Sequence, residues 1–146
     1  RIYSKAQIRA KCVLMSMGCA ATMLAPSAWS SGEKDAIVLQ VSDGDPKKWN
    51  LALNNARNAF NDLGKDNIDI KTVVYGPGID MLRMESVTAG RSDESIKAGI
   101  SIVAYENTMT AKKLVKENMN ESTSYVPAGV VQLIRRQQQG WAYIRP

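Results

Sequence analysis

Short apolar runs alternate with amphipathic stretches along this chain, and that alternation limits the folds it can adopt. Residues 36–41 read Ala-Ile-Val-Leu-Gln-Val, as a strand buried on both faces requires. Similar runs occupy residues 68–75, 100–105 and 141–144, and residues with apolar side chains at helical spacing separate them. Strands joined by helical crossovers pair in parallel. The sequence therefore predicts a three-layer α/β domain with a mostly parallel sheet and helices on both faces.

The first helix has the clearest predicted boundaries. Asp45 is expected to cap its start, Pro46 suits its first turn, and Gly64 is expected to end it. Further helices are expected within residues 81–99 (one short and one longer), from residue 106 through 115, and from residue 130 to Gly140.

The first 30 residues differ in composition from the rest. Positive charges come first: Arg1, Lys5, Arg9 and Lys11. An apolar stretch over residues 12–25 follows, and no acidic residue occurs before residue 31. These features, with small residues near Ser30, predict a signal peptide over residues 1–30 and a mature domain over residues 31–146. The alternative, an N-terminal core helix, fits the lack of acidic residues less well.

The predicted signal peptide implies a periplasmic or secreted location. No apolar run reaches the roughly 18 residues of a membrane span, so none is expected after processing. The chain does not begin with Met, and we expect a few further residues upstream.

The leader also carries the chain's charge excess and both of its cysteines. The net charge is +5, from 19 basic and 14 acidic residues. Without the four basic residues of the leader, fifteen basic residues face fourteen acidic ones. Nucleic-acid binding needs clustered basic residues, so no nucleic-acid partner is expected.

The mature domain lacks the residues of several common catalytic and metal sites. Cys12 and Cys19 are the two cysteines of the sequence, and histidine is absent. Ser-His-Asp and Cys-His catalysis and thiolate or imidazole metal sites are therefore excluded. We expect no catalytic residue, no metal site and no cofactor, and this favours a protein that is not an enzyme.

The loops that follow the predicted strands are the places to look for a ligand. In open α/β sheets, ligands bind beyond the carboxyl ends of the strands. Tyr105, which ends the third strand, is expected to face such a cleft. The candidate ligand-binding residues are Asp43, Tyr75, Gly76, Gly78, Tyr105, Asn107, Thr108 and Pro127.

Structural roles compete with binding roles at these positions. Asp43 and Asp45 could hold a metal ion, but a turn carboxylate and a helix cap explain them better. Residues 76–78 read Gly-Pro-Gly and could approach an anion, but a structural turn is the favoured interpretation. Asn107 and Thr108 stand at a helix start, where a capping role is expected.

Six segments carry a family resemblance: 38–45, 54–58, 74–79, 106–108, 125–131 and 137–146. They are similar to segments of the DsrE/DsrF-like proteins, a family of small sulfur-relay proteins, in its exported branch. The resemblance covers about residues 36–146. It implies a flavodoxin-like three-layer fold and self-association, as a trimer or a hexamer.

The resemblance also bears on chemistry. In sulfur-handling relatives a loop cysteine carries persulfide sulfur, and in this branch it stands just before an x-Asn-Thr motif. That is the position of Tyr105, and a phenol cannot hold a persulfide. We therefore expect an exported, non-catalytic binding or assembly module linked to sulfur metabolism, with a small-molecule or protein partner. The alternative is a sulfur-transfer or redox accessory protein that acts through a partner's cysteine.

Overall fold

A five-stranded sheet in which all pairings are parallel forms the centre of the domain. The computed structural model describes residues 34–146, so the predicted signal peptide lies outside the described residues. The strand order is β4-β3-β2-β1-β5. The strands are β1 (Asp35–Val41), β2 (Ile68–Val74), β3 (Ser101–Tyr105), β4 (Ser124–Val126) and β5 (Ala142–Ile144). The predicted parallel sheet is confirmed.

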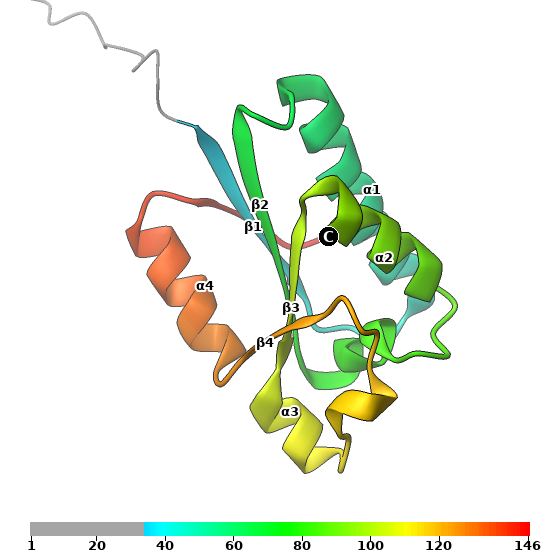
Figure 1. The fold of residues 1–146 in the computed structure, drawn as a ribbon. Coiled ribbons are helices and arrows are strands. Elements are labelled where there is room, and N and C mark those ends of the chain that lie inside the picture. The colour runs from blue at the N-terminus through cyan, green and yellow to red at the C-terminus, as the bar shows by residue number, and fades with distance from the viewer. Residues whose placement is uncertain (1–33) are drawn as a thin grey trace, which may run out of the picture. The chain divides into compact units, whose positions relative to one another are not determined.

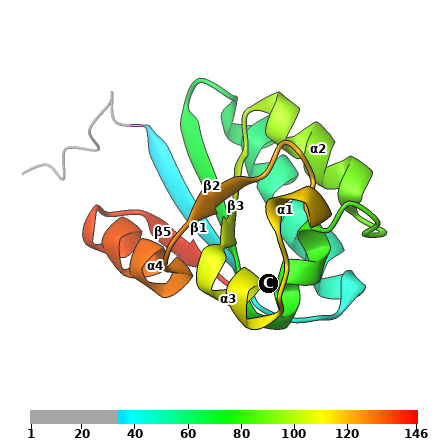
Figure 2. The same ribbon diagram turned by 60° about the horizontal axis from the view of Figure 1, so that its bottom comes forward.

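Helices cover both faces of the sheet and complete three layers (Figure 1). Helices α1 (Pro46–Leu63) and α2 (Ala89–Ala98) pack on one face, and α4 (Gly129–Gln138) packs on the other (Figure 2). From β1 to β4 the chain steps across the sheet in one direction, and it then returns past β1 to β5. Parallel crossovers are right-handed, so the helix of the returning connection must lie on the opposite face. This confirms the three-layer, flavodoxin-like α/β architecture.

The two faces of the sheet bury cores of different size. On the α1 and α2 side, Leu39 and Val74 are fully buried and pack with Trp49 of α1. On the α4 side a smaller cluster centres on Val38 and Leu133. Alternate residues of each strand point to opposite faces, so continuous apolar runs serve both cores.

Helix α1 begins and ends where the sequence predicts. The Asp45 carboxylate accepts a hydrogen bond from the backbone N–H of Lys47 at 2.9 Å, and Pro46 is the first helical residue. Gly64 follows the last turn with φ of 87°, in the region that favours glycine, and its N–H donates to the Phe60 carbonyl. Among the helices of residues 34–146, none has the length and apolar character needed to cross a membrane.

Two later segments differ from the sequence-based expectation. Residues 76–78, expected as a loop, begin the 3₁₀ helix η1 (Gly76–Leu82). Helix α3 (Glu106–Ala111) ends four residues before Val115, so the longer predicted helix is wrong. Lys113 takes a left-handed φ of 56°, and the turn places Leu114 against the core before η2 (Lys116–Asn118). Burying Leu114 on the main core favours this turn over a longer helix.

Strand β4 was not predicted, because its three residues lead directly into Pro127 and Gly129, which favour a turn. Tertiary contacts place it beside β3. The backbone N–H of Asn120 donates to the Leu82 carbonyl at 2.8 Å, and Arg83 pairs with Met119 in an isolated antiparallel bridge. These contacts bring the segment before β4 to the edge of the sheet.

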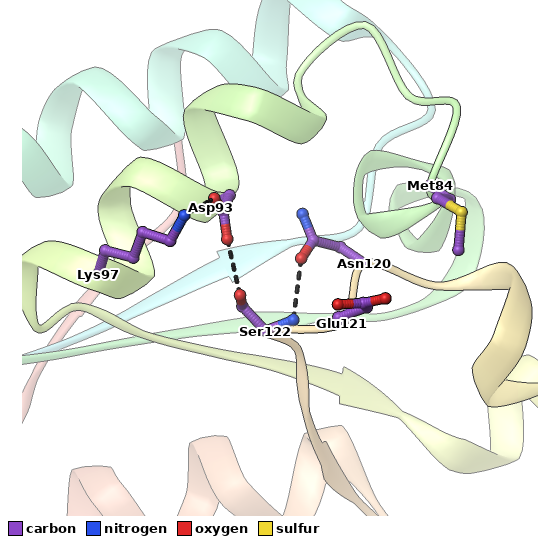
Figure 3. A pocket seen from close by; sticks show the side chains of 6 residues that line it. All are labelled: Met84, Asp93, Lys97, Asn120, Glu121 and Ser122. Atoms are coloured by element: carbon purple, nitrogen blue, oxygen red, sulfur yellow. Dashed lines mark hydrogen bonds and ion pairs between the residues drawn. The ribbon is translucent and has the colours of Figure 1, made fainter.

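Side chains of α2 also hold the segment before β4 (Figure 3). The Ser122 hydroxyl donates to the Asp93 carboxylate at 2.6 Å, and Lys97 pairs with its other oxygen at 2.6 Å. Both contacts lower the pKa of Asp93, the Lys97 contact most. A pocket of about 400 Å³ lies here, with the Glu121 side chain in its wall. The polar groups of Asp93 and Ser122 are thus used to attach the loop to α2.

Candidate functional site

The carboxyl ends of β2 and β3 form a shallow pocket of about 370 Å³. The strands are parallel, so their following loops meet at one edge of the sheet. Seven residues line the pocket: Gly76, Pro77, Tyr105, Asn107, Thr108, Ala111 and Lys112. Four of the eight candidates from sequence are therefore brought together: Gly76, Tyr105, Asn107 and Thr108. Its volume lies near the lower end of the roughly 300–1,000 Å³ range of small-molecule sites.

Tyr105 forms the aromatic wall of the pocket, and Tyr75 lies behind it. Their rings meet edge to face, with centroids 6.0 Å apart and planes at 87°. Gly129, the first residue of α4, touches both rings, and a Cβ there would lie 3.4 Å from an atom of each. Tyr75 therefore supports Tyr105 and is not part of the pocket lining.

Thr108 ties the loop after β2 to α3. Its hydroxyl oxygen accepts a hydrogen bond from the backbone N–H of Gly76 at 3.1 Å, and Gly76 has a left-handed φ of 55°. Asn107 donates from its side-chain amide to the Tyr105 hydroxyl at 3.5 Å. Helix α3 has no side-chain cap, so the capping role expected of Asn107 and Thr108 is wrong. Their polar groups instead hold the pocket together.

Thr108→Val is expected to lower the free energy of unfolding by about 1 to 2 kcal/mol, because it leaves the half-buried Gly76 N–H without a partner. Urea denaturation followed by circular dichroism measures this change. Thr110→Val is the matched control, since the Thr110 hydroxyl bonds to the Glu106 carbonyl on the exposed helix surface. Equal losses in the two variants would show that the Gly76 contact contributes nothing of its own.

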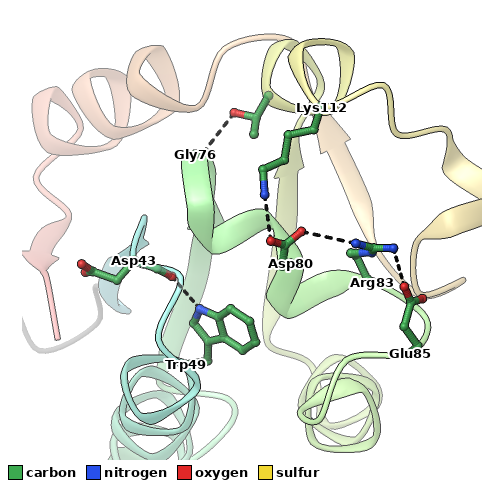
Figure 4. Close-up of polar contacts among 8 residues, drawn as sticks. Asp43, Trp49, Gly76, Asp80, Arg83, Glu85 and Lys112 are labelled. Carbon is green, nitrogen blue, oxygen red and sulfur yellow. Dashed lines mark hydrogen bonds and ion pairs between the residues drawn. The ribbon is translucent and has the colours of Figure 1, made fainter.

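The other candidates lie outside the pocket lining. Gly78 is buried beneath β1, and a Cβ on it would lie 2.7 Å from the Val41 carbonyl oxygen. The main-chain oxygen of Asp43 accepts a hydrogen bond from the Trp49 indole at 2.6 Å, and its carboxylate points away from the ring (Figure 4). Pro127 is exposed, just before α4. Asp43 and Gly78 thus fix the loops around the pocket.

Three pocket residues were missed from sequence: Pro77, Ala111 and Lys112. A signal for Lys112 was present, because it follows Thr108 by four residues and so shares its helix face. The Lys112 ammonium lies 2.7 Å from an Asp80 carboxylate oxygen. Arg83 lies 3.9 Å from the other Asp80 oxygen and pairs with Glu85 at 2.5 Å (Figure 4). A chain of alternating charges therefore extends from one wall of the pocket.

Burial raises the pKa of the Tyr75 phenol above its ordinary value of 10.0, and the nearby Tyr143 adds to the shift. The folded protein thus keeps the Tyr75 proton to higher pH than the unfolded chain does. Tyr75 therefore contributes stability below about pH 10 that is lost as the pH rises through its folded pKa.

Tyr75→Phe is consequently expected to reduce the loss of stability at alkaline pH. Urea denaturation at about pH 8 and about pH 10.5 measures the slope for each protein. The values at about pH 8 serve as the reference for any change in packing. The same alkaline loss in both proteins would contradict the assignment to Tyr75.

No family model matches this chain, and a search of curated proteins found no match. Solved structures do match. MTH1491 from Methanobacterium thermoautotrophicum, a protein of unknown function, is 32% identical with a TM-score of 0.73. The match covers 77% of this chain and all (100%) of the archaeal chain. BT1422 from Bacteroides thetaiotaomicron, also of unknown function, is 16% identical with a TM-score of 0.63, over 77% of this chain and 95% of that one.

The similarity to BT1422 shows a shared fold alone. The similarity to MTH1491 shows a closer relation. An identity of 32% over the entire archaeal chain, with matching structures, shows common descent. This chain therefore belongs to the same family as MTH1491.

Proposed function

We propose that the mature chain is a periplasmic or secreted binding module of the DsrE/DsrF-like type, linked to sulfur metabolism, whose ligand site is the pocket around Tyr105. The observation that carries the proposal is the pocket itself. It lies beyond the carboxyl ends of β2 and β3, where ligands of open α/β sheets bind. It combines an aromatic and aliphatic surface with a few polar groups, as small-molecule sites do.

The groups around the pocket suit binding better than catalysis. They are a phenol, an amide, a hydroxyl and an ammonium, and no thiol or imidazole stands among them. Among residues 34–146, no three His, Cys, Asp or Glu side chains gather as a metal site would require. Tyr105 cannot replace a cysteine that carries a persulfide.

We place self-association, as a trimer or hexamer, on the outer face of α4. Val130, Val131 and Ile134 lie on adjacent turns of this helix and are 46%, 40% and 48% exposed. An exposed apolar face of this kind suits contact with a second copy of the chain. Size-exclusion chromatography with light scattering gives the mass, and a monomer would contradict this part of the proposal.

Ligand-observed NMR on the full chain tests the pocket, with benzoate and benzamide as flat, small probes. We expect at least one probe to bind. Ala111→Trp fills the pocket from its wall and is expected to abolish binding, whereas Ala98→Trp on α2, an exposed alanine outside the pocket, leaves it unchanged. Binding that survives Ala111→Trp, or no binding of either probe, would contradict the proposal.

The alternative is a sulfur-transfer accessory that acts through a partner's cysteine. It is supported by Tyr105, which lines the pocket at the position where the resemblance expects the persulfide cysteine. Transfer of labelled sulfane sulfur from a persulfide donor to a small thiol acceptor, measured with and without the mature chain, separates the two functions. We expect the mature chain, which has no cysteine after residue 19, to leave the rate of transfer unchanged. A rate that rises with the concentration of the mature chain would overturn the binding function in favour of a sulfur-transfer accessory.

A further inference from the structure

The pocket around Tyr105 carries one kind of charge. Lys112 is the charged side chain of its lining, and no carboxylate lines it. Asp80, the partner of Lys112, is not part of the lining and also lies near Arg83. An ammonium group has three hydrogens, and the single contact with Asp80 uses one of them. Two hydrogens of the Lys112 ammonium therefore remain for a ligand.

Hydrogen-bond donors also stand among the lining residues. The Thr108 hydroxyl accepts from the Gly76 N–H, so its own hydrogen remains to be donated. The Asn107 amide directs one of its two hydrogens to the Tyr105 hydroxyl and retains the other. The phenol accepts that bond and keeps its own hydrogen. These three neutral donors and the Lys112 ammonium belong to the small polar part of the lining, which suits a single acceptor group.

The remainder of the lining is apolar. The Tyr105 ring, Pro77 and Ala111 supply this surface, and the pocket holds about 370 Å³. One cation suits a single negative charge better than a phosphate dianion, which proteins usually bind with several donors and cations. The apolar surface suits a flat ring or a short hydrocarbon body.

From this arrangement we infer that the ligand is a small organic monoanion, with an acid group against Lys112 and a flat apolar body against Tyr105. The inference rests on the proposed function of the same pocket and adds the chemical class of its ligand. Lys112 selects the charge, and Tyr105 with Pro77 and Ala111 contacts the body. Arginine at position 112 would keep the selection, whereas a neutral side chain would remove it.

Calorimetric titration of the full chain with benzoate, benzamide and inorganic phosphate tests the inference at low salt, where charge contributes most. Benzoate is expected to bind about fivefold more tightly than its neutral analogue benzamide, as a partly exposed charge pair allows. Phosphate is expected to bind more weakly than benzoate. Lys112→Gln should remove the preference for benzoate and Lys112→Arg should keep it.

Lys113→Gln is the matched control, because Lys113 carries the same charge one residue away and does not line the pocket. It should leave the preference within about twofold of the wild type, and circular dichroism verifies the fold of each variant. Equal binding of benzoate and benzamide, with both lost in Ala111→Trp, would overturn the ligand class and leave the binding function standing. Failure of both probes would overturn both, and a preference unchanged by Lys112→Gln would overturn the role of Lys112.

Discussion

Gly78→Ala is expected to lower the free energy of unfolding by about 3 kcal/mol, at the upper end of what overpacking costs. An alanine Cβ would lie 2.7 Å from the Val41 carbonyl oxygen and 3.0 Å from its carbon. Both atoms belong to the backbone of β1, which pairs with β2 and β5 on its two sides and cannot move away. Urea denaturation followed by circular dichroism measures the loss.

Gly90→Ala is the control for Gly78→Ala. Gly90 is the second residue of α2, and a Cβ there would meet no atom within 4 Å. Alanine favours a helix over glycine, so stability should stay the same or rise by about 0.5 to 1 kcal/mol. Similar losses in both variants would mean that the contact with Val41 does not limit residue 78.

Trp49→Ala is expected to cost about 3 to 5 kcal/mol, because it empties a large volume in the main core. Trp49 is 6% exposed and packs among the buried residues of α1 and β1. Its indole N–H also donates to the main-chain oxygen of Asp43 at 2.6 Å, which fixes the loop between β1 and α1. Trp49→Ala therefore removes packing and a loop anchor together.

Trp49→Phe separates these two contributions. Phenylalanine keeps most of the packing and loses the hydrogen bond, so about 1 kcal/mol of the loss is expected from the bond. Chemical denaturation followed by circular dichroism compares the two variants. A loss in Trp49→Phe as large as that in Trp49→Ala would contradict the assignment of most of the energy to packing.

Much of the fold could be predicted because its signals are local. Asp45, Pro46 and Gly64 act on their own helix ends, so the boundaries of α1 follow from three residues. Continuous apolar runs marked β1, β2 and β3, since strands covered on both faces need them. Strand β4 and the early end of α3 depend on contacts with distant residues, such as the bond from Asn120 to Leu82, and no local pattern encodes those.

The residues of the candidate site also fall into those that could be predicted from the sequence and those that could not. Its position at the strand ends followed from the order of elements, and Gly76, Tyr105, Asn107 and Thr108 were found on that ground. Lys112 was missed although it follows Thr108 by four residues on the same helix face, because its place in the pocket wall beside Asp80 depends on how α3 packs against η1.

The parallel α/β class, the ends of α1 and the absence of histidine follow from the sequence alone, because composition and local patterns suffice for these. The folded arrangement was needed to show that α4 covers the opposite face of the sheet, since that depends on the direction of the last crossover. It also decided that Thr108 binds Gly76 instead of capping α3, and that Lys112 stands in the pocket wall. Those contacts join residues about 30 positions apart (32 for Gly76 and Thr108), and only the packed loops bring them within reach.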